Sequence, residues 1–459
     1  MTPHPKIAIV GSGPAGCYLA QSLRRSLPDA ELTVLDRAAA PYGLIRYGVA
    51  PDHQHTKAIT RQFDRLFQSP EVRFVGGIDI DTDVTLASLR EIFDVVVLAT
   101  GLPLDRAITV PGAELAGVYA AGEIVRALNA HPEAASAQLP QLGTDVVVIG
   151  AGNVALDLVR FLVKDRSGYI GSDVHDAALE QYVAAPAQRV TVVSRSSAAE
   201  SKGDPQMLSE LATLPRASYA VTHAGRNDTT ESHDDRTITA RLAAIAALAD
   251  PARGTLPGPT VSLRFGALPT RILGTEHVTG IELACGTETV TVPATAVITA
   301  IGFRPAVGAE ATTAQTAAGV IASLPANLTT GRIERGLYRV GWAQRGPRGA
   351  IPENRASAKL VADEIVADLG ARAQPSLAVG FAGLDAELRT RAIDFSQWLT
   401  LDAHERATAP TGRVRQKVIS HTAMIDIARG GAHAAPGASA PTASAETPPA
   451  PGPDPKGTP

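Results

Sequence analysis

Cysteine is scarce in this chain of 459 residues, which contains only Cys17 and Cys285. The two are far apart and form no CxxC pair. We therefore expect neither disulfide staples nor an internal dithiol relay like those of glutathione and thioredoxin reductases. Few cysteines and scattered histidines also predict no metal site. Cys17 falls at the start of a predicted helix, where a packing role is expected.

Long apolar runs and excess charge are missing as well. No stretch reaches the roughly 18 consecutive apolar residues that a membrane helix needs. The formal net charge is −4, and no basic run is interleaved with aromatic residues, so nucleic-acid binding is not expected. The first predicted strand begins by Lys6, which leaves no room for a signal or transit peptide. We expect a cytoplasmic protein without a membrane span, and the oligomeric state stays open.

The last part of the chain has little to bury. Residues 431–459 are mostly alanine, proline, glycine, serine and threonine. Such a segment cannot offset the entropy cost of becoming ordered. It is predicted to be a disordered tail.

Two glycine-rich turns, each between an apolar strand and a helix-compatible segment, are the most informative feature that is present. They read Gly11-Ser12-Gly13-Pro14-Ala15-Gly16 and Gly150-Ala151-Gly152-Asn153-Val154-Ala155. In such a turn the first glycine allows a tight bend, the second lets the backbone approach a pyrophosphate, and the third small residue lets helix pack on strand. The pyrophosphate lies at the helix N-terminus, which favours negative charge. One such turn is weak evidence, but two predict a protein that holds two dinucleotides.

The order of the apolar segments predicts an α/β fold with two Rossmann-like domains of the three-layer ββα type. The first domain is discontinuous, residues 1–104 plus 336–430, and is expected to hold one dinucleotide. The second, residues 105–335, is inserted into it and is expected to hold the other. Strands are predicted at 6–10, 31–35, 72–75, 94–99, 145–149, 190–194, 260–265, 278–283, 289–292 and 296–300.

Three further segments have local predictions. Residues 57–68 carry apolar side chains on helical spacing and predict an amphipathic helix. Residues 165–188 look like an insertion with its own helix. Residues 216–260 show an irregular pattern, with the polar stretch 226–235 predicted as an exposed loop.

Two residues stand where dinucleotide specificity is set. Asp36 ends the strand after the first turn, where an acidic side chain accepts hydrogen bonds from a ribose hydroxyl; the alternative is an acidic strand end facing water. Arg195 follows the strand after the second turn, where its planar donors suit a 2′-phosphate. That favours NADP over NAD, although an arginine on a surface turn can also be simply solvated.

The segment PYGLIRYGVAPDH at residues 41–53 is too specific for a generic loop. Here the chain resembles the adrenodoxin reductase family of NADPH–ferredoxin reductases. The resemblance continues in GNVALD at 152–157 and VGWAQRGPRGAI at 340–351, and weakly in GRVRQK at 412–417. It covers residues 1 to about 425 and implies that the first domain binds FAD and the second binds NAD(P).

The resemblance implies residues for both cofactors. FAD contacts are implied at Ala15, Asp36, Leu44 and either Ile78 or Asp79, with Trp342 and Gly349-Ala350-Ile351 closing over the flavin ring. NADP contacts are implied at Arg106, Ala151 to Val154, Arg195 and the neighbouring Ser196. Trp342 could instead be an ordinary core tryptophan. NAD(H) stays possible as the coenzyme.

The resemblance also implies a pair across the two domains. In the family a histidine at the position of His53 pairs with a glutamate at the position of Glu210. A histidine beside a carboxylate suits a proton shuttle near neutral pH, or can position the nicotinamide. The alternative is a structural hydrogen bond joining the domains, since hydride transfer itself needs no acid or base.

Departures from the family pattern fall on the nicotinamide side. Ser196 stands where the family has a second arginine, and Met207 where it has a glutamate that touches the nucleotide. The stretch 350–355 also differs. The first turn is unchanged, so FAD binding is predicted firmly, whereas the preference for NADP is in doubt.

The resulting hypothesis is an FAD enzyme that takes electrons from NADPH and releases them singly to an acidic ferredoxin-type iron–sulfur protein, for example one that supplies a cytochrome P450. One alternative is a pathway-specific FAD oxidoreductase on the same scaffold with weakened or altered nicotinamide use. Another is a non-catalytic flavin-binding partner. A Baeyer–Villiger monooxygenase is disfavoured, because the chain lacks an FxGxxxHxxxW element.

Overall fold

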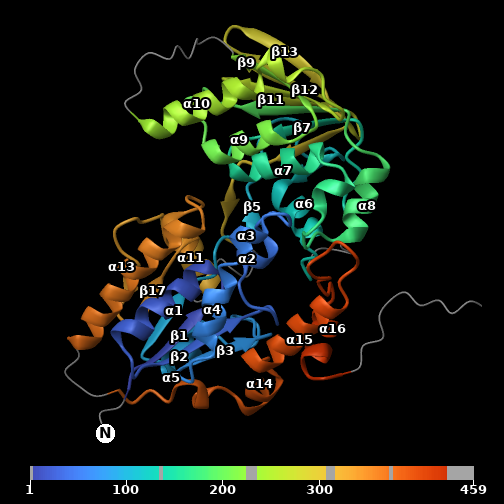
Figure 1. Cartoon of the computed structure of the whole chain (residues 1–459). Helices are drawn as coiled ribbons and strands as arrows, with labels where there is room; N and C mark the ends of the chain where they lie inside the picture. Colours follow the sequence, from blue (N-terminus) through green and yellow to red (C-terminus); the bar gives the residue numbers. More distant parts are fainter. Residues whose placement is uncertain (1–3, 134–137, 224–234, 307–315, 372–375, 432–459) are drawn as a thin grey trace, which may run out of the picture.

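The computed structural model describes residues 4–133, 138–223, 235–306, 316–371 and 376–431. Within these ranges the chain forms two lobes, each built on a six-stranded sheet (Figure 1). The predicted tail lies outside the described residues except for residue 431, as does nearly all of the polar loop predicted at 226–235.

The first sheet has the order β16-β17-β4-β1-β2-β3. All neighbours are parallel except β16 and β17, and Ile9 of β1 lies opposite Val34 of β2. Its strands are β1 (Lys6–Val10), β2 (Glu31–Asp36), β3 (Val72–Gly76), β4 (Val95–Leu98), β16 (Arg332–Glu334) and β17 (Leu337–Arg339).

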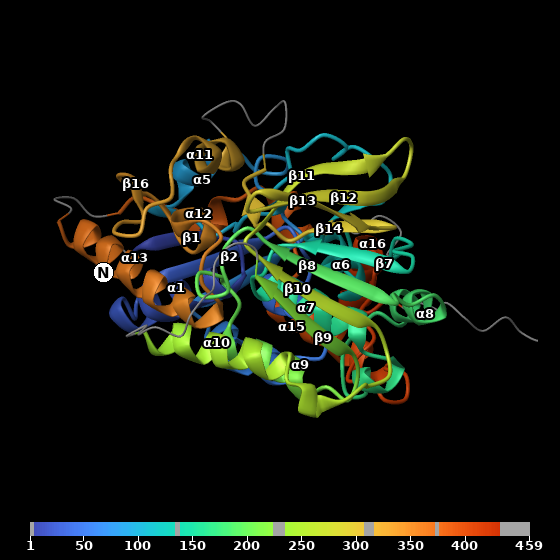
Figure 2. The same ribbon diagram turned by 90° about the horizontal axis from the view of Figure 1, so that it is seen from above.

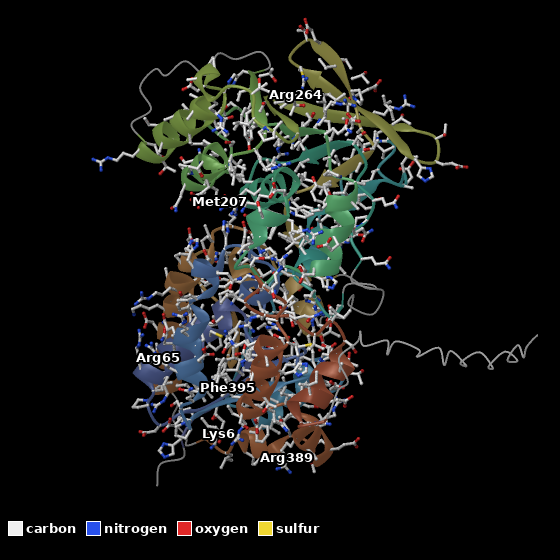
Figure 3. The ribbon with its side chains drawn as sticks, turned by 45° about the vertical axis from the view of Figure 1, so that its right-hand side comes forward. Lys6, Arg65, Met207, Arg264, Arg389 and Phe395 are labelled. Atoms are coloured by element: carbon white, nitrogen blue, oxygen red, sulfur yellow. The ribbon has the colours of Figure 1, made fainter. Side chains whose placement is uncertain are left out.

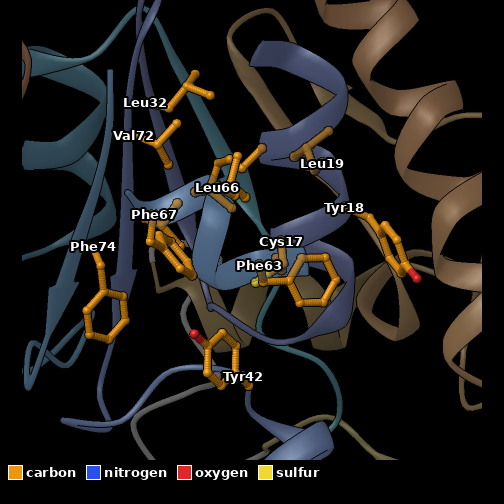
Figure 4. Close-up of a cluster of buried hydrophobic side chains, with 14 of the residues drawn as sticks. Cys17, Tyr18, Leu19, Leu32, Tyr42, Phe63, Leu66, Phe67, Val72 and Phe74 are labelled. Carbon is orange, nitrogen blue, oxygen red and sulfur yellow. The ribbon is translucent and has the colours of Figure 1, made fainter. Parts of the chain in front are cut away.

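Apolar residues on both faces of β1 explain why helices cover both sides of this sheet. Ile7 and Ile9 point into one core, and Ala8 and Val10 into the other. The first core, drawn in Figure 4, is closed by α1 (Pro14–Ser26), α4 (Thr60–Phe67), α13 (Ile351–Gly370), α15 (Phe395–Ala407) and α16 (His421–Ala428). The second core is closed by α5 (Leu86–Ile92) and α11 (Ala317–Ser323).

The second sheet is parallel throughout, in the order β6-β14-β7-β8-β10-β9. Its strands are β6 (Val118–Ala120), β7 (Asp145–Ile149), β8 (Arg189–Ser194), β9 (Ser218–His223), β10 (Thr260–Phe265) and β14 (Ala296–Thr299). One face is covered by α6 (Ala121–Leu128), α7 (Asn153–Val163), α8 (Asp176–Ala184), α9 (Pro205–Thr213) and α10 (Arg236–Leu248).

A smaller antiparallel sheet covers the other face of the second sheet (Figure 2). It consists of β11 (Ala267–Gly274), β12 (Val278–Cys285) and β13 (Glu288–Pro293). The alternation in β7 explains this arrangement, because Val146 and Val148 face the helices whereas Val147 and Ile149 face the antiparallel sheet. This lobe therefore has the predicted ββα layers.

Short elements complete the chain. The strands β5 (Leu104–Asp105) and β15 (Phe303–Arg304) pair with each other between the two lobes (Figure 1). The short helices are α2 (Leu44–Tyr47), α3 (Gln54–Lys57), α12 (Trp342–Arg345), α14 (Ala386–Arg391) and the 3₁₀ turns η2 (Arg166–Tyr169), η3 (Pro251–Arg253) and η4 (Gly380–Gly383).

Three local predictions need correction. The helix predicted at 57–68 is instead two helices, α3 and α4, separated by residues 58 and 59. The segment 216–260 is not irregular, since it contains β9 and α10. An edge strand and an alanine-rich helix carry few large apolar residues, and this weakens both periodic signals. The strand β11 was missed because Pro269 and the adjacent register shift disguise the alternation.

The return of the chain to the first lobe can also be located. The N–H of Ala317 donates to Asp81 at 2.8 Å, and Val320 packs in the second core of the first sheet. The chain therefore contacts the first lobe again at α11, before the domain boundary predicted at residue 335. The helix predicted inside 165–188 is α8.

Candidate functional site

The first glycine turn joins β1 to α1, and its three glycines meet different constraints. Gly11 has a φ of +111°, and a Cβ there would lie 2.5 Å from the carbonyl oxygen of Ala99. A Cβ on Gly16 would lie 2.0 Å from the carbonyl oxygen of Gly11. Gly13, by contrast, has an ordinary φ of −66° and no described atom within 4 Å of that position. The space beside Gly13 is therefore open to a ligand.

The start of α1 faces the same space. Pro14 occupies its first turn, where the missing N–H removes no helical hydrogen bond, and the free N–H groups that follow favour an anion. Ala15 is buried, and a Cβ on Gly341 would lie 2.4 Å from the Cβ of Ala15. The segment after β17 is thus pressed against the turn.

Asp36 ends β2 beside the turn. Its Oδ2 accepts the N–H of Ser12 at 2.8 Å and the Ser12 hydroxyl at 2.5 Å, while Oδ1 accepts the N–H of Ala38 at 2.9 Å. The N–H of Ile78 donates to the carbonyl of Asp36 at 3.0 Å, which places Ile78 in the same corner. Burial raises the pKa of the neighbouring Asp79. The Asp36 carboxylate is therefore oriented by hydrogen bonds with the glycine turn and does not simply face water.

The segment PYGLIRYGVAPDH folds back over the first turn. The N–H of Tyr42 donates to the carbonyl of Ser12 at 3.1 Å, and a Cβ on Gly43 would lie 3.0 Å from the Cα of Gly13. Leu44 follows as a large apolar side chain that is 42% exposed. An exposed leucine beside the opening at Gly13 provides an apolar surface for a ligand.

Trp342 lies at the start of α12, in the loop that leads from β17 to α13. Its Nε1 donates to the carbonyl of Gly349 at 3.4 Å, and its ring stacks on Phe303 with 5.4 Å between centroids. The side chain is half-buried against the second core of the first sheet. Gly349 and Ala350 are exposed beside Trp342, and Ile351 begins α13.

These residues fit a bound FAD in shape and chemistry. The turn leaves room for a pyrophosphate at Gly13, and Asp36 offers acceptors for a ribose beside it. Leu44 and Trp342 provide apolar and aromatic surface for a ring system.

The second turn, between β7 and α7, repeats the first. Gly150 has a φ of +124°, and a Cβ there would lie 2.4 Å from the carbonyl oxygen of Ala300. At Gly152 the nearest described atom to a Cβ is the Cβ of Lys202, 4.0 Å away, so this position is also open. Ala155 replaces the third glycine and is fully buried. The same shape test thus fits a second dinucleotide.

The other residues implied for the second dinucleotide differ in their surroundings. Ala151 and Val154 are half-buried against the helical core, and the Oδ1 of Asn153 accepts the N–H of Asp204 at 2.9 Å. Arg195 is exposed just after β8. Arg106 lies farther along, at the junction of the lobes, where its Nε donates to the carbonyl of Phe303 at 3.1 Å.

His53 and Glu210 meet between the lobes, as the family resemblance implies. The His53 Nε2 lies 3.3 Å from a Glu210 oxygen, and His53 Nδ1 lies 3.7 Å from Asp157. Arg160 also contacts the His53 Nε2 and pairs with Asp52 at 2.6 Å. Three carboxylates and an arginine therefore surround one imidazole.

The charges around His53 determine its protonation. Burial and the Arg160 guanidinium lower its pKa, and the opposing effects of Asp52 and Glu210 do not compensate. The ring is therefore neutral at pH 7, and its Nε2 faces both Arg160 and Glu210. Burial raises the pKa of Asp157 to about 7, despite the nearby Arg160. Asp52 has a lowered pKa: burial raises it, but Arg160 and Lys164 outweigh that effect.

Comparisons with known proteins agree with this geometry. A family model described as pyridine nucleotide-disulphide oxidoreductase matches residues 5–215. Cindoxin reductase of Citrobacter braakii is 38% identical over 445 residues, which cover 94% of this chain and 92% of that protein. NADPH-ferredoxin reductase FprA of Mycobacterium tuberculosis is 30% identical over 457 residues, covering 92% and 99%.

The chain belongs to the adrenodoxin reductase family of NADPH–ferredoxin reductases. A solved structure of M. tuberculosis FprA in complex with NADPH has a TM-score of 0.82 at 30% identity and covers 93% of this chain and 100% of its own. NADPH:adrenodoxin oxidoreductase of Arabidopsis thaliana is 29% identical, over 90% of this chain and 93% of that protein. The match therefore includes both lobes.

Two of the departures from the family pattern lie on the loop after β8 and on α9. Ser196 is half-buried, and its carbonyl accepts the Ser194 hydroxyl at 3.0 Å and the N–H of Gly266 at 3.0 Å. Met207, labelled in Figure 3, packs at the border of the helical core of the second lobe. Neither side chain offers a positive charge or a carboxylate for a nucleotide.

Sequence reasoning missed Arg160, Asp157 and Asp52, which hold His53 and Glu210 in place. Asp52 directly precedes His53, and Asp157 closes the GNVALD motif, so two of the three lay inside segments already recognised. Arg160 follows Asp157 by one helical turn and contacts it at 3.2 Å.

Other site types find no support in the described ranges. No group of three or more histidine, cysteine or acidic residues there has a metal-binding arrangement. No described helix is both long and apolar enough to cross a membrane. Cys17 is a buried free thiol and Cys285 a partly exposed one.

Proposed function

We propose that this protein is an FAD-dependent reductase that takes electrons from NADPH and passes them to an acidic ferredoxin-type carrier. The observation that carries the proposal is the pair of dinucleotide turns, at Gly11 and Gly150, each with space for a ligand at its second glycine. The names of the relatives, which include NADPH, ferredoxin and adrenodoxin, support the same activity.

A bound FAD supplies the change from two electrons to one, since it accepts a pair from a nicotinamide and releases them singly. The chain supplies binding and orientation. The first turn and Asp36 hold one dinucleotide, and the second turn with Arg195 holds the other. Burial raises the pKa of the Cys17 thiol well above its usual value, so this cysteine stays protonated and unreactive. Electrons therefore leave to an external acceptor rather than to a protein disulfide.

His53 and Glu210 are proposed to align the nicotinamide and to hold a proton at the imidazole between the lobes. The lowered pKa keeps the ring neutral at pH 7, and the ring gains a proton only as the pH falls below 6.5. Glu210 raises this pKa, so the Glu210→Gln variant should have a still lower one. The acid limb of its kcat/KM profile for NADPH should move to lower pH.

A pH series of initial rates from pH 5 to 9 measures this shift. Glu288→Gln is the control, because Glu288 is an exposed carboxylate at the start of β13, in the same lobe. A Glu210→Gln profile that coincides with the unmodified protein's would contradict the proposed role and leave a structural contact.

A second candidate function keeps the scaffold but alters the coenzyme. Ser196 and Met207 remove a positive charge and a carboxylate that the family pattern places near the nucleotide. An enzyme of this kind would use NADH as well as NADPH, or use both poorly. A non-catalytic flavin-binding protein would bind FAD and show no reduction by either coenzyme.

Steady-state assays separate these candidates. With NADPH as donor and cytochrome c as final acceptor, the rate should rise at least about tenfold when a ferredoxin is added, because the carrier relays single electrons. A kcat/KM for NADH that equals or exceeds that for NADPH would support the altered-coenzyme candidate. No reduction with either coenzyme would refute the proposed function.

A further inference from the structure

The segment 195–204, between β8 and α9, lies directly over the second glycine turn. A Cβ on Gly203 would lie 3.1 Å from the carbonyl oxygen of Ala151. The N–H of Asp204 donates to the Asn153 side chain at 2.9 Å. This 195–204 loop therefore forms one wall of the opening at Gly152.

The backbone of the 195–204 loop is held from outside. Arg241, from α10, donates to the carbonyl of Gly203 at 2.8 Å and to that of Ala199 at 2.8 Å. The Ser201 hydroxyl donates to the carbonyl of Ala198 at 2.8 Å in a buried bond. Because these hydrogen bonds hold the backbone on both sides of Lys202, its Cα has a defined position beside the turn.

Lys202 differs from the other lysines of the described ranges. Each of the others pairs with a carboxylate; the pairs are Lys6–Glu31, Lys57–Asp173, Lys164–Asp52, Lys359–Asp363 and Lys417–Asp173. Lys202 is exposed and has no hydrogen-bond or ion-pair partner there. Its ammonium is thus free to take an anion.

The acidic residues next to Lys202 are engaged locally. Glu200 accepts the Ser197 hydroxyl at 3.2 Å. Asp204 caps α9, where its Oδ1 accepts the N–H of Gln206 at 2.8 Å. Neither carboxylate forms an ion pair with Lys202 within the described ranges.

The position of Lys202 indicates which phosphate it would meet. Its Cβ is the nearest described atom to a Cβ built on Gly152, at 4.0 Å. The second glycine of such a turn is where the backbone approaches the pyrophosphate. Arg195, at the end of β8, stands instead where a 2′-phosphate is read.

We propose that Lys202 is a coenzyme-binding residue that pairs with the pyrophosphate of the nicotinamide dinucleotide. The inference rests on the proposed function. Ser196 offers no second arginine for the 2′-phosphate, and Lys202 places a positive charge at a different phosphate. Because NADP(H) and NAD(H) share the pyrophosphate, Lys202 strengthens binding of both without discriminating between them, whereas Arg195 discriminates.

Binding to the oxidised holoenzyme tests this assignment by isothermal titration with three probes. ADP-ribose carries only the pyrophosphate, adenosine 2′-monophosphate carries only the 2′-phosphate, and NADP⁺ carries both. Lys202→Ala should raise the Kd for NADP⁺ and ADP-ribose by about tenfold, through loss of a charge-assisted contact, and leave that for adenosine 2′-monophosphate unchanged. Arg195→Ala should weaken the binding of NADP⁺ and adenosine 2′-monophosphate and leave the Kd for ADP-ribose unchanged.

Two control variants complete the design. Lys202→Arg should retain most of the affinity, and Lys359→Ala, an exposed lysine on α13, should change none of the three Kd values. If Lys202→Ala leaves the Kd values for NADP⁺ and ADP-ribose unchanged, the inference about Lys202 is wrong but the proposed function stands. The same conclusion follows if Lys202→Ala weakens the binding of adenosine 2′-monophosphate and not that of ADP-ribose. An unmodified holoenzyme that binds neither NADP⁺ nor ADP-ribose overturns the proposed function as well.

Discussion

Asp173→Asn is expected to lower the free energy of unfolding by about 3–5 kcal/mol, the cost of leaving a buried charge without its partner. Asp173 bridges two lysines: it lies 2.7 Å from the Lys57 Nζ and 3.0 Å from the Lys417 Nζ. All three side chains are at most 8% exposed. Both ammonium groups also donate to the Oδ1 of Asn129, at 2.9 and 3.1 Å.

The charges of this cluster explain the size of the effect. Burial raises the pKa of Asp173, but Lys417 and Lys57 outweigh this and bring it to about 2. Burial lowers the pKa of both lysines. The carboxylate thus holds two positive charges in a dry site, and an amide cannot replace it. The cluster also joins the lobes, since Lys57 ends α3 whereas Asn129 follows α6.

Urea unfolding at pH 7 measures this loss. Asp363→Asn is the control: it removes an exposed partner of Lys359 on α13, and a change below about 1 kcal/mol is expected. Lys57→Met should cost less than Asp173→Asn, because it leaves Asp173 paired with Lys417. Equal stability of Asp173→Asn and the unmodified protein, or a larger loss from Lys57→Met, would contradict this account of the cluster.

Gly13→Ala is expected to weaken FAD binding while leaving the polypeptide folded. The backbone at Gly13 has φ −66° and ψ −179°, which alanine adopts readily, and no described atom lies within 4 Å of its Cβ. The methyl group would instead occupy the space where a pyrophosphate approaches the turn. We expect the Kd for FAD to rise at least about tenfold, or 1.4 kcal/mol.

Gly16→Ala is the contrasting variant. Its Cβ would lie 2.0 Å from the carbonyl oxygen of Gly11, so the chain itself must shift and both folding and FAD binding should suffer. Flavin content after dialysis, together with thermal unfolding of the apoprotein, distinguishes the two. Full flavin occupancy in Gly13→Ala would show that the opening beside Gly13 is not the pyrophosphate site.

Local patterns carried most of the fold prediction. The strands around both turns and the inward alternation in β1 and β7 follow from neighbouring residues, and so does Asp36 at the end of β2. The edge strand β11 and the alanine-rich helix α10 escaped, because a proline and small side chains hide their periodicity.

The site was predictable only where its residues lie within motifs. His53 and Glu210 were paired through the family resemblance, but the contact of His53 with Arg160 depends on how the two lobes meet. The Lys57–Asp173–Lys417 cluster joins three distant parts of the chain, and no periodicity or spacing encodes such a contact. Lys202 escaped because it lies in a loop that departs from the family pattern.

Anaerobic titration of the holoenzyme with NADPH tests the central claim most directly, namely that the two glycine turns hold two dinucleotides that exchange electrons. The flavin absorbance should disappear as one equivalent of NADPH is added and return when an oxidised ferredoxin is supplied. A flavin that stays oxidised in excess NADPH and in excess NADH would contradict the account.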